Sequence, residues 1–321
     1  MCIRDRLHIE EGVKIIAVYD DIADYILVKQ GGKINAVGTP DKPIVMTSEK
    51  EEPGAWGGIH ICGRAHTNAE GGKGSSEIGG AVYGGNDDAD NSGTLQYIRL
   101  EYTGFAFDEE HEANGISFYG VGNGTIVDHC QAYKGSDDGF EFFGGSVNVS
   151  NLVAVSCSDD SFDWTEGWNG KGTNLVAYQE AESTLGYDCD CLMECDNNGS
   201  NNAATPVAHP VLKNLILVGN GGSKQGIRLR AGTEVEIDNA KVCGKGQPLT
   251  VETALTENAL KNGTSKLTNI TLTSELSCKE GIYTHADFIA VTSNKVDANL
   301  SYSSFEDIKK ECSWMNGNWV K

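Results

Sequence analysis

The feature that most constrains the fold of this 321-residue chain is an internal repeat of short segments in which apolar and polar residues alternate. Segment 7–18 aligns with segment 26–37 at an offset of 19 residues, with five identities that include Gly12 and Gly31. Alternation on both sides of a glycine is typical of two short strands joined by a corner. The chain is therefore expected to add one coil of about 20 residues after another.

The same pattern continues through the middle of the chain with longer loops. Segments 136–142 and 158–164 match at an offset of 22 residues, and each follows a longer apolar run. Intervals of this length without a long amphipathic helical pattern favour a parallel solenoid over a β/α solenoid or a β-propeller. The sequence predicts an all-β fold, a right-handed parallel β-helix of about eight or nine coils.

The two ends of the sequence depart from the repeat. Residues 1–6 carry charge without the apolar stretch of a signal peptide, and we expect them to be the foreign or disordered start of a fragment. The β-helix is expected over residues 7–285. Residues 286–321 show weak helical periodicity and contain two tryptophans, so they are expected to form a C-terminal cap over the open end.

Charge and hydropathy limit the classes of partner. The chain has 25 Lys and Arg against 46 Asp and Glu, a net charge of −21. Nucleic acids and anionic membrane surfaces require a basic face, so neither is expected as a partner. No transmembrane segment is expected either, because no apolar stretch approaches the ~18 residues that a membrane span needs.

Acidic residues gather on one face of the predicted β-helix. In each repeated short strand, the residue between two inward-facing apolar positions must point outward. Stacking the coils places these residues in one column: Ser117, Glu141, Asp163, Glu194 and Arg228. Coils lie about 4.8 Å apart, so the three successive carboxylates repel one another unless a cation, Arg228 or protonation relieves them.

A hard divalent cation such as Ca²⁺ suits this face, because it is bound by several carboxylate and carbonyl oxygens in flexible geometry. The corner that precedes each strand adds further acids, so five residues are candidate metal ligands: Asp138, Glu141, Asp160, Asp163 and Glu194. The alternative is a solvated acidic face on which each carboxylate is hydrated or caps a turn. The sequence leaves both interpretations open.

Several segments of the chain resemble secreted bacterial right-handed β-helix proteins, a family of predicted surface proteins and lipoproteins with a pectate-lyase-like fold. The similarity extends over roughly residues 7–240 and rests on segments 36–48, 53–59, 77–80, 91–102, 136–145 and 226–233. The resemblance implies an extracellular or outer cell-surface location. It implies no particular reaction, because a fold does not fix a function.

Three functions are compatible with the acidic face. We favour an extracellular protein that binds Ca²⁺, a polysaccharide or a cell-surface glycan without catalysis. In the second, a Ca²⁺-dependent polysaccharide lyase acts on acidic polysaccharide, with Arg228 or Arg230 as the catalytic base that abstracts a proton. In the third, a glycoside hydrolase uses two of the column's carboxylates as acid and base. The third is least favoured, because the Gly-His-Gly segment of polygalacturonase-type β-helix hydrolases does not occur in this chain.

Two aromatic residues, Tyr119 and Trp168, are expected to lie exposed beside the acidic face. Sugar rings stack on exposed aromatic side chains that have polar neighbours. Both residues are therefore predicted to contact a bound glycan. The alternative, left open for Trp168, is that the ring stacks inside the solenoid.

Overall fold

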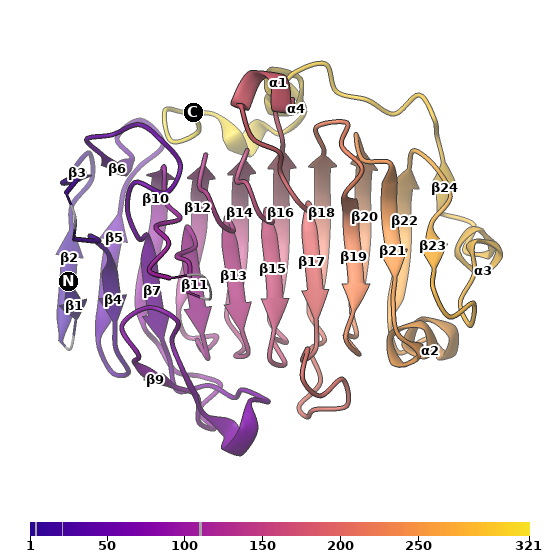
Figure 1. Cartoon of the computed structure of the whole chain (residues 1–321), viewed down its shortest axis with the longest axis horizontal. Coiled ribbons are helices and arrows are strands. Elements are labelled where there is room, and N and C mark those ends of the chain that lie inside the picture. Colours follow the sequence, from indigo (N-terminus) through magenta and orange to yellow (C-terminus); the bar gives the residue numbers. More distant parts are fainter. Residues whose placement is uncertain (4, 21, 109–110) are drawn as a thin grey trace.

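The computed structural model describes residues 1–3, 5–20, 22–108 and 111–321. Its strands stack into two long parallel sheets that run the length of the molecule (Figure 1). The fold is a parallel β-helix, as the repeats predicted.

Among the described residues, the first sheet contains ten strands in which every neighbouring pair is parallel. In spatial order they are β1 (Cys2–Ile3), β4 (Ile26–Val28), β7 (Ile59–Cys62), β11 (Ile116–Tyr119), β13 (Phe140–Phe143), β15 (Phe162–Thr165), β17 (Met193–Asp196), β19 (Gln225–Arg230), β21 (Gln247–Val251) and β23 (Ser277–Cys278).

The second sheet contains twelve strands in the part of the chain that the structure describes. Ten follow one path: β2 (Arg6–Ile9), β5 (Lys33–Val37), β10 (Gly93–Glu101), β12 (Ile126–Tyr133), β14 (Asn148–Val155), β16 (Lys171–Tyr178), β18 (Val211–Val218), β20 (Glu236–Cys243), β22 (Lys266–Leu272) and β24 (Lys295–Val296). Two more, β3 (Lys14–Ala17) and β6 (Ile44–Ser48), pair with each other, and β6 also pairs with β10.

Each long strand of the second sheet bends sharply at one residue. In β14, β16, β18 and β20 this residue is an asparagine with left-handed backbone, φ between 55° and 62°. Asparagine tolerates this conformation better than most residues with a side chain. These residues form the asparagine column, Asn151, Asn174, Asn214 and Asn239, in which each later amide donates to the amide oxygen of the coil before, at 2.8, 3.0 and 2.9 Å.

The interior of the β-helix is filled by stacked apolar side chains. Phe118 and Phe142 of adjacent coils lie with ring centroids 5.0 Å apart and planes 10° apart, and Phe140 and Phe162 repeat the arrangement at 5.6 Å. These residues alternate with the polar positions of the same strands, so the pleat that buries them turns the polar side chains to the outer face.

The described residues of segment 1–6 do not lie outside the β-helix as expected. Strand β1 pairs with β4, and β2 pairs with β5, so the described residues of this segment continue both sheets. The boundary predicted at residue 7 is therefore corrected.

The C-terminal residues do not form the single cap that was predicted. At the end of the β-helix, α2 (Ala254–Asn262) and α3 (His285–Ala290) pack against the last coils, and Phe288 of α3 is fully buried in the core (Figure 1). Residues 305–321, which we call the C-terminal strap, include α4 (Phe305–Glu311) and run back along the outside of the second sheet.

The strap covers apolar residues that the bent strands turn outward. Val153, Val176 and Ile216 of three successive coils form a buried cluster with strap residues that include Trp319. The backbone N–H of Asn318 in the strap donates to the carbonyl of Pro40 at 2.7 Å, close to the opposite end of the molecule. The outer face is apolar at these positions and therefore needs a cover, which explains the course of the strap.

Candidate functional site

The predicted column of outward-facing residues exists in the expected register. Ser117 pairs with Glu141, Glu141 with Asp163, Asp163 with Glu194, and Glu194 with Arg228. Together with the corner residues Asp138 and Asp160, the carboxylates of this column form what we call the acidic ladder: Asp138, Glu141, Asp160, Asp163 and Glu194. All five predicted metal ligands therefore lie on one face of the first sheet.

The acidic ladder is more enclosed than a solvated face would be. Asp138 is 6% exposed and Asp160 is 4% exposed, while Glu141 and Asp163 are half-buried. The long loop between β7 and β10, which we call the insertion 63–92, folds over the neighbouring part of this face. Its residues Ala81 and Tyr83 pack in one buried cluster with side chains of the first sheet.

The two aromatic residues expected to be exposed are both buried, so the expectation of exposure is wrong, and for Trp168 the alternative of stacking inside the solenoid is the one observed. Tyr119 is completely covered by the insertion 63–92 and stacks on Phe143 at 4.4 Å between centroids. Trp168 is 1% exposed, stacks on Phe142 at 4.1 Å, and donates from Nε1 to the carbonyl of Val147 at 3.2 Å. The sequence did not reveal that an insertion covers one ring and that the next turn folds the other into the core.

The carboxylates of the ladder approach one another closely. Asp138, Glu141 and Asp163 each offer one oxygen, and these three oxygens lie within 4.8 Å of one another. We call this group the three-carboxylate cluster. Two further groups meet the same limit: Asp137, Asp138 and Asp159; and Asp160, Cys191 and Glu194.

Hydrogen bonds hold part of the ladder in place. Asp138 Oδ1 accepts from the backbone N–H of Asp160 at 2.8 Å, and Asp160 Oδ1 accepts from the backbone N–H of Cys191 at 2.6 Å. These two carboxylates thus cap turns of the following coil, which is the role that the alternative interpretation gave them. Glu141 Oε2 accepts from the Asn114 amide at 2.5 Å.

Asp163 differs from its neighbours. Its Oδ1 is buried and has no hydrogen-bond partner among the residues that the structure describes. A buried acceptor without a partner costs the full desolvation of that atom, about 1–3 kcal/mol and more when it is charged. This atom is the clearest unmet requirement in the ladder.

Burial raises the pKa of all three members of the three-carboxylate cluster well above the usual range. The negative charges of Glu77 and Asp163 raise the pKa of Glu141 further, and those of Glu194 and Asp196 do the same for Asp163. Burial and neighbouring acids also raise the pKa of Asp138. Without protonation or a counter-charge, the folded state therefore bears a cost at neutral pH.

One acidic residue near this face was not foreseen from the sequence. Glu77 lies in the insertion 63–92, accepts a hydrogen bond from the Tyr119 hydroxyl at 3.0 Å, and has its pKa raised by burial to about 7. It belongs to no repeat, so neither alternation nor coil spacing could have placed it there. Asp137 was noted at the corner, and burial with the charge of Asp159 raises its pKa to about 7.

The two arginines predicted as candidate bases are engaged in ion pairs. Arg228 contacts Glu194 at 2.8 Å and Glu252 at 3.2 Å, while Arg230 contacts Asp196 at 2.7 Å and also Glu194. Burial opposes the charged form of both arginines, but these carboxylates outweigh it and raise the pKa of each. This end of the ladder is therefore neutralised by the protein's own side chains.

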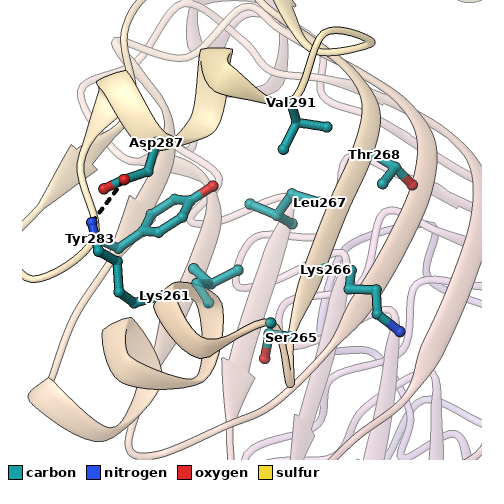
Figure 2. Close-up of a pocket in the computed structure, with 10 residues that line it drawn as sticks. Lys261, Ser265, Lys266, Leu267, Thr268, Tyr283, Asp287 and Val291 are labelled. Atoms are coloured by element: carbon teal, nitrogen blue, oxygen red, sulfur yellow. Dashed lines mark hydrogen bonds and ion pairs between the residues drawn. The ribbon is translucent and has the colours of Figure 1, made fainter.

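A separate hollow of about 320 Å³ lies between α2 and α3 at the far end of the β-helix (Figure 2). Its two lysines are already paired: Lys261 with Asp287 at 2.7 Å, and Lys266 with Glu236 at 2.7 Å. The walls of the hollow are partly apolar and partly polar, and the charges of both lysines are balanced by their carboxylate partners. None of the predicted site residues lines this hollow.

Comparison with known proteins agrees with this architecture. A family model described as a pectate-lyase like beta helix domain matches residues 4–321. The chain belongs to this family. No curated protein matches the chain, and no solved structure does. Among the described residues, no helix is long and apolar enough to cross a membrane.

Proposed function

We propose that this pectate-lyase-like β-helix protein is a non-catalytic, extracellular surface protein whose acidic ladder binds a divalent cation, Ca²⁺ in the first instance, and whose partner is a glycan. Asp138, Glu141 and Asp163 would hold the cation. The glycan partner and the extracellular location are supported by membership of the family and by the resemblance to surface proteins. The cation site is supported by geometry.

The observation that carries the proposal is the buried, unpartnered Oδ1 of Asp163 beside two further carboxylates whose pKa values are raised. A cation would satisfy this atom and remove the repulsion among the three charges. Glu194 already has arginine partners, so a cation is needed most at the three-carboxylate cluster.

The ligand chemistry favours Ca²⁺ over softer metals. The three-carboxylate cluster offers oxygen only, and carboxylate oxygens suit Ca²⁺, Mg²⁺ and Mn²⁺ better than Zn²⁺ or Cu⁺. Mg²⁺ demands near-ideal octahedral geometry, whereas Ca²⁺ accepts irregular sets of six to eight oxygens. The coil spacing fixes the positions of carboxylate oxygens on successive coils, so these oxygens cannot adjust to an ideal octahedron. Ca²⁺ accommodates such a set better than Mg²⁺ does.

A polysaccharide lyase is less well supported. A base that abstracts a proton must lose its own, yet the carboxylates around Arg228 and Arg230 raise the pKa of both guanidinium groups. General-base catalysis is efficient when the pKa of the base lies near the working pH. The arginines are therefore better placed to neutralise Glu194 and Asp196 than to act on a substrate.

Thermal unfolding with and without Ca²⁺ tests the proposal. The melting temperature of the parent protein should be higher with Ca²⁺ in excess of the chelator than in chelator alone. A ligand at 100 times its Kd stabilises the folded state by about 2.7 kcal/mol. The triple variant Asp138→Asn, Glu141→Gln, Asp163→Asn should lose this gain. A control that removes three exposed acids elsewhere, Glu10→Gln, Asp41→Asn and Asp87→Asn, should keep it.

If the parent shows no Ca²⁺-dependent gain, or the triple variant retains it in full, the ladder is not the cation site. Formation of an unsaturated product from uronate polymers, dependent on Ca²⁺ and lost in Arg228→Ala, would replace the binding protein by the lyase.

A further inference from the structure

We propose that a cleft beside the acidic ladder is a binding subsite for a neutral saccharide. The cleft has a volume of about 690 Å³ and is lined by residues of three segments, 68–70, 165–166 and 198–201. The inference goes beyond the cation site, and it rests on the proposed function only for the expectation that the partner is a glycan.

Three parts of the chain that are distant in sequence form the cleft. Residues 68–70 come from the insertion 63–92, residues 198–201 come from the loop after β17, and Thr165 ends β15. In Figure 1 the insertion and the loop after β17 project from the same edge of the β-helix. Thr165 follows Asp163 by two positions, so the cleft opens on the same face as the ladder, about 7 Å along the strand.

The walls of the cleft are held by hydrogen bonds between the two loops. The Asn198 amide donates to Asn68 Oδ1 at 2.9 Å, and the Asn68 amide donates to Asn197 Oδ1 at 2.8 Å. Asn198 Oδ1 also accepts from the backbone N–H groups of Ser200 and Asn201 at 3.0 and 2.9 Å. Preorganisation of this kind lowers the entropy cost of binding.

Glu166 is fixed in the same manner. Its Oε2 accepts from the hydroxyl of Thr67 at 2.6 Å and from that of Tyr83 at 2.8 Å. The carboxylate is therefore oriented through one oxygen, and Oε1 lies outside this pair of bonds. An oriented carboxylate oxygen accepts hydrogen bonds from ligand hydroxyls.

The polar lining matches the chemistry of sugar hydroxyls. A sugar hydroxyl is both donor and acceptor. The hydroxyls of Thr165 and Ser200 offer both roles, and the amide nitrogen of Asn201 offers a donor. A wholly apolar ligand would leave these groups desolvated and unpaired, which is costly.

The charge of the lining selects against acidic sugars. Glu70 and Glu166 contribute carboxylates, and none of the described residues that line the cleft is basic. A uronate or sulfated sugar would meet repulsion, whereas a neutral hexose would not. None of these described lining residues is aromatic either, so stacking is missing and we expect an affinity near the millimolar range.

Gly199 provides a way to close the cleft without removing any of its hydrogen bonds. A Cβ atom at this position would meet only Asp196 Oδ2, at 3.9 Å, so a large side chain can be introduced without backbone strain. Gly246 offers a matched control far along the chain, since a Cβ atom there would meet only the Gly222 carbonyl oxygen, at 3.8 Å.

The test is titration calorimetry of the full chain with neutral hexasaccharides of glucose, mannose and galactose, and with an oligogalacturonate of equal length. We expect at least one neutral hexasaccharide to bind, at least tenfold weaker binding by Gly199→Trp, and unchanged binding by Gly246→Trp. The Ca²⁺-dependent gain in melting temperature should persist in Gly199→Trp, which shows that the variant folds and that the two sites are separate.

The proposal is overturned if no neutral hexasaccharide binds at about 10 mM, if Gly199→Trp binds as the parent does, or if the oligogalacturonate binds more tightly than every neutral sugar. A failed cation proposal would instead leave saccharide binding intact and remove only the Ca²⁺ effect. The two failures are therefore distinguishable.

Discussion

Two columns of side chains run along this β-helix, and they solve the problem of stacking identical groups in opposite ways. In the asparagine column each amide after Asn151 donates to the amide of the preceding coil, at 2.8 to 3.0 Å. In the acidic ladder, Glu141 and Asp163 occupy paired positions on adjacent strands but have no proton to offer each other when ionised. The coil spacing is the same, and only the chemistry of the group differs.

The comparison shows what a solenoid can and cannot repeat. An amide carries both a donor and an acceptor, so a column of amides satisfies itself. A carboxylate column needs something from outside the pattern: a proton, an arginine or a cation. Arg228 and Arg230 supply the need at one end, and the three-carboxylate cluster is left without such a partner among the described residues.

The largest expected effect comes from breaking the asparagine column. Asn174→Ala removes the hydrogen bonds to Asn151 and from Asn214 and places alanine in a left-handed conformation, so it should lower the free energy of unfolding by about 3 kcal/mol. Urea unfolding measures the change. Asn174→Gly tolerates the left-handed backbone and should be less damaging; equal loss in both variants would show that the hydrogen bonds, not the backbone, carry the effect.

A substitution in the acidic ladder should raise the free energy of unfolding rather than lower it. Replacing Asp163 by Asn removes one of the repelling charges and supplies a donor, so in chelator at neutral pH it should raise the free energy of unfolding by about 1–2 kcal/mol. With saturating Ca²⁺ the same variant should be less stable than the parent, because a ligand is lost. The diagnostic result is that the order of stability of variant and parent reverses between chelator and saturating Ca²⁺. A variant that is less stable than the parent in both conditions would contradict the prediction.

The pH dependence in chelator should be unusual for an acidic protein. The pKa values of Asp137 and Glu77 are raised to about 7, above the value near 4 of an unfolded carboxyl, so the folded state binds more protons between these limits. The stabilisation from these two groups is therefore complete below about pH 4 and is lost progressively as the pH rises to about 7. Melting temperatures at half-unit intervals test this. Excess Ca²⁺ should reverse the slope, because the cation requires ionised ligands.

The smallest effect is expected at the end that is already neutralised. Arg230→Gln removes ion pairs to Asp196 and Glu194 that are partly exposed, and we expect a loss of about 1 kcal/mol. The variant should also strengthen the Ca²⁺-dependent gain in melting temperature, because one more carboxylate is left without a counter-charge. A Ca²⁺ effect that weakens instead would mean that the arginine supports the cation site.

The strands and their register could be predicted from the sequence because alternation fixes which side chain faces outward. The pairing of Glu141 with Asp163, and of Glu194 with Arg228, follows from aligning Phe140 with the corresponding residue of each coil. A one-residue slip would place these charges in the core, so the register has little freedom.

The parts of the site that lie on insertions could not be predicted in the same way. Glu77, the burial of Tyr119 and the cleft at Asn198 depend on how two loops fold back onto the first sheet, and no period governs a loop. The C-terminal strap was misplaced for a related reason. Its amphipathic pattern predicts that it packs on an apolar surface but does not identify that surface. In the structure the surface includes Val153 and Ile216, which lie far from the open end of the β-helix.

The strap has a consequence for the order in which the molecule can be completed. Contacts within a coil and between adjacent coils are close in sequence, so most of the β-helix can assemble progressively as the polypeptide leaves the ribosome. The contact between Asn318 and Pro40 spans almost the entire sequence and cannot form until every coil between them has been synthesised. Until the strap is in place, the side chains of Val153, Val176 and Ile216 face water, so burial of this apolar stripe is the last step in completing the fold.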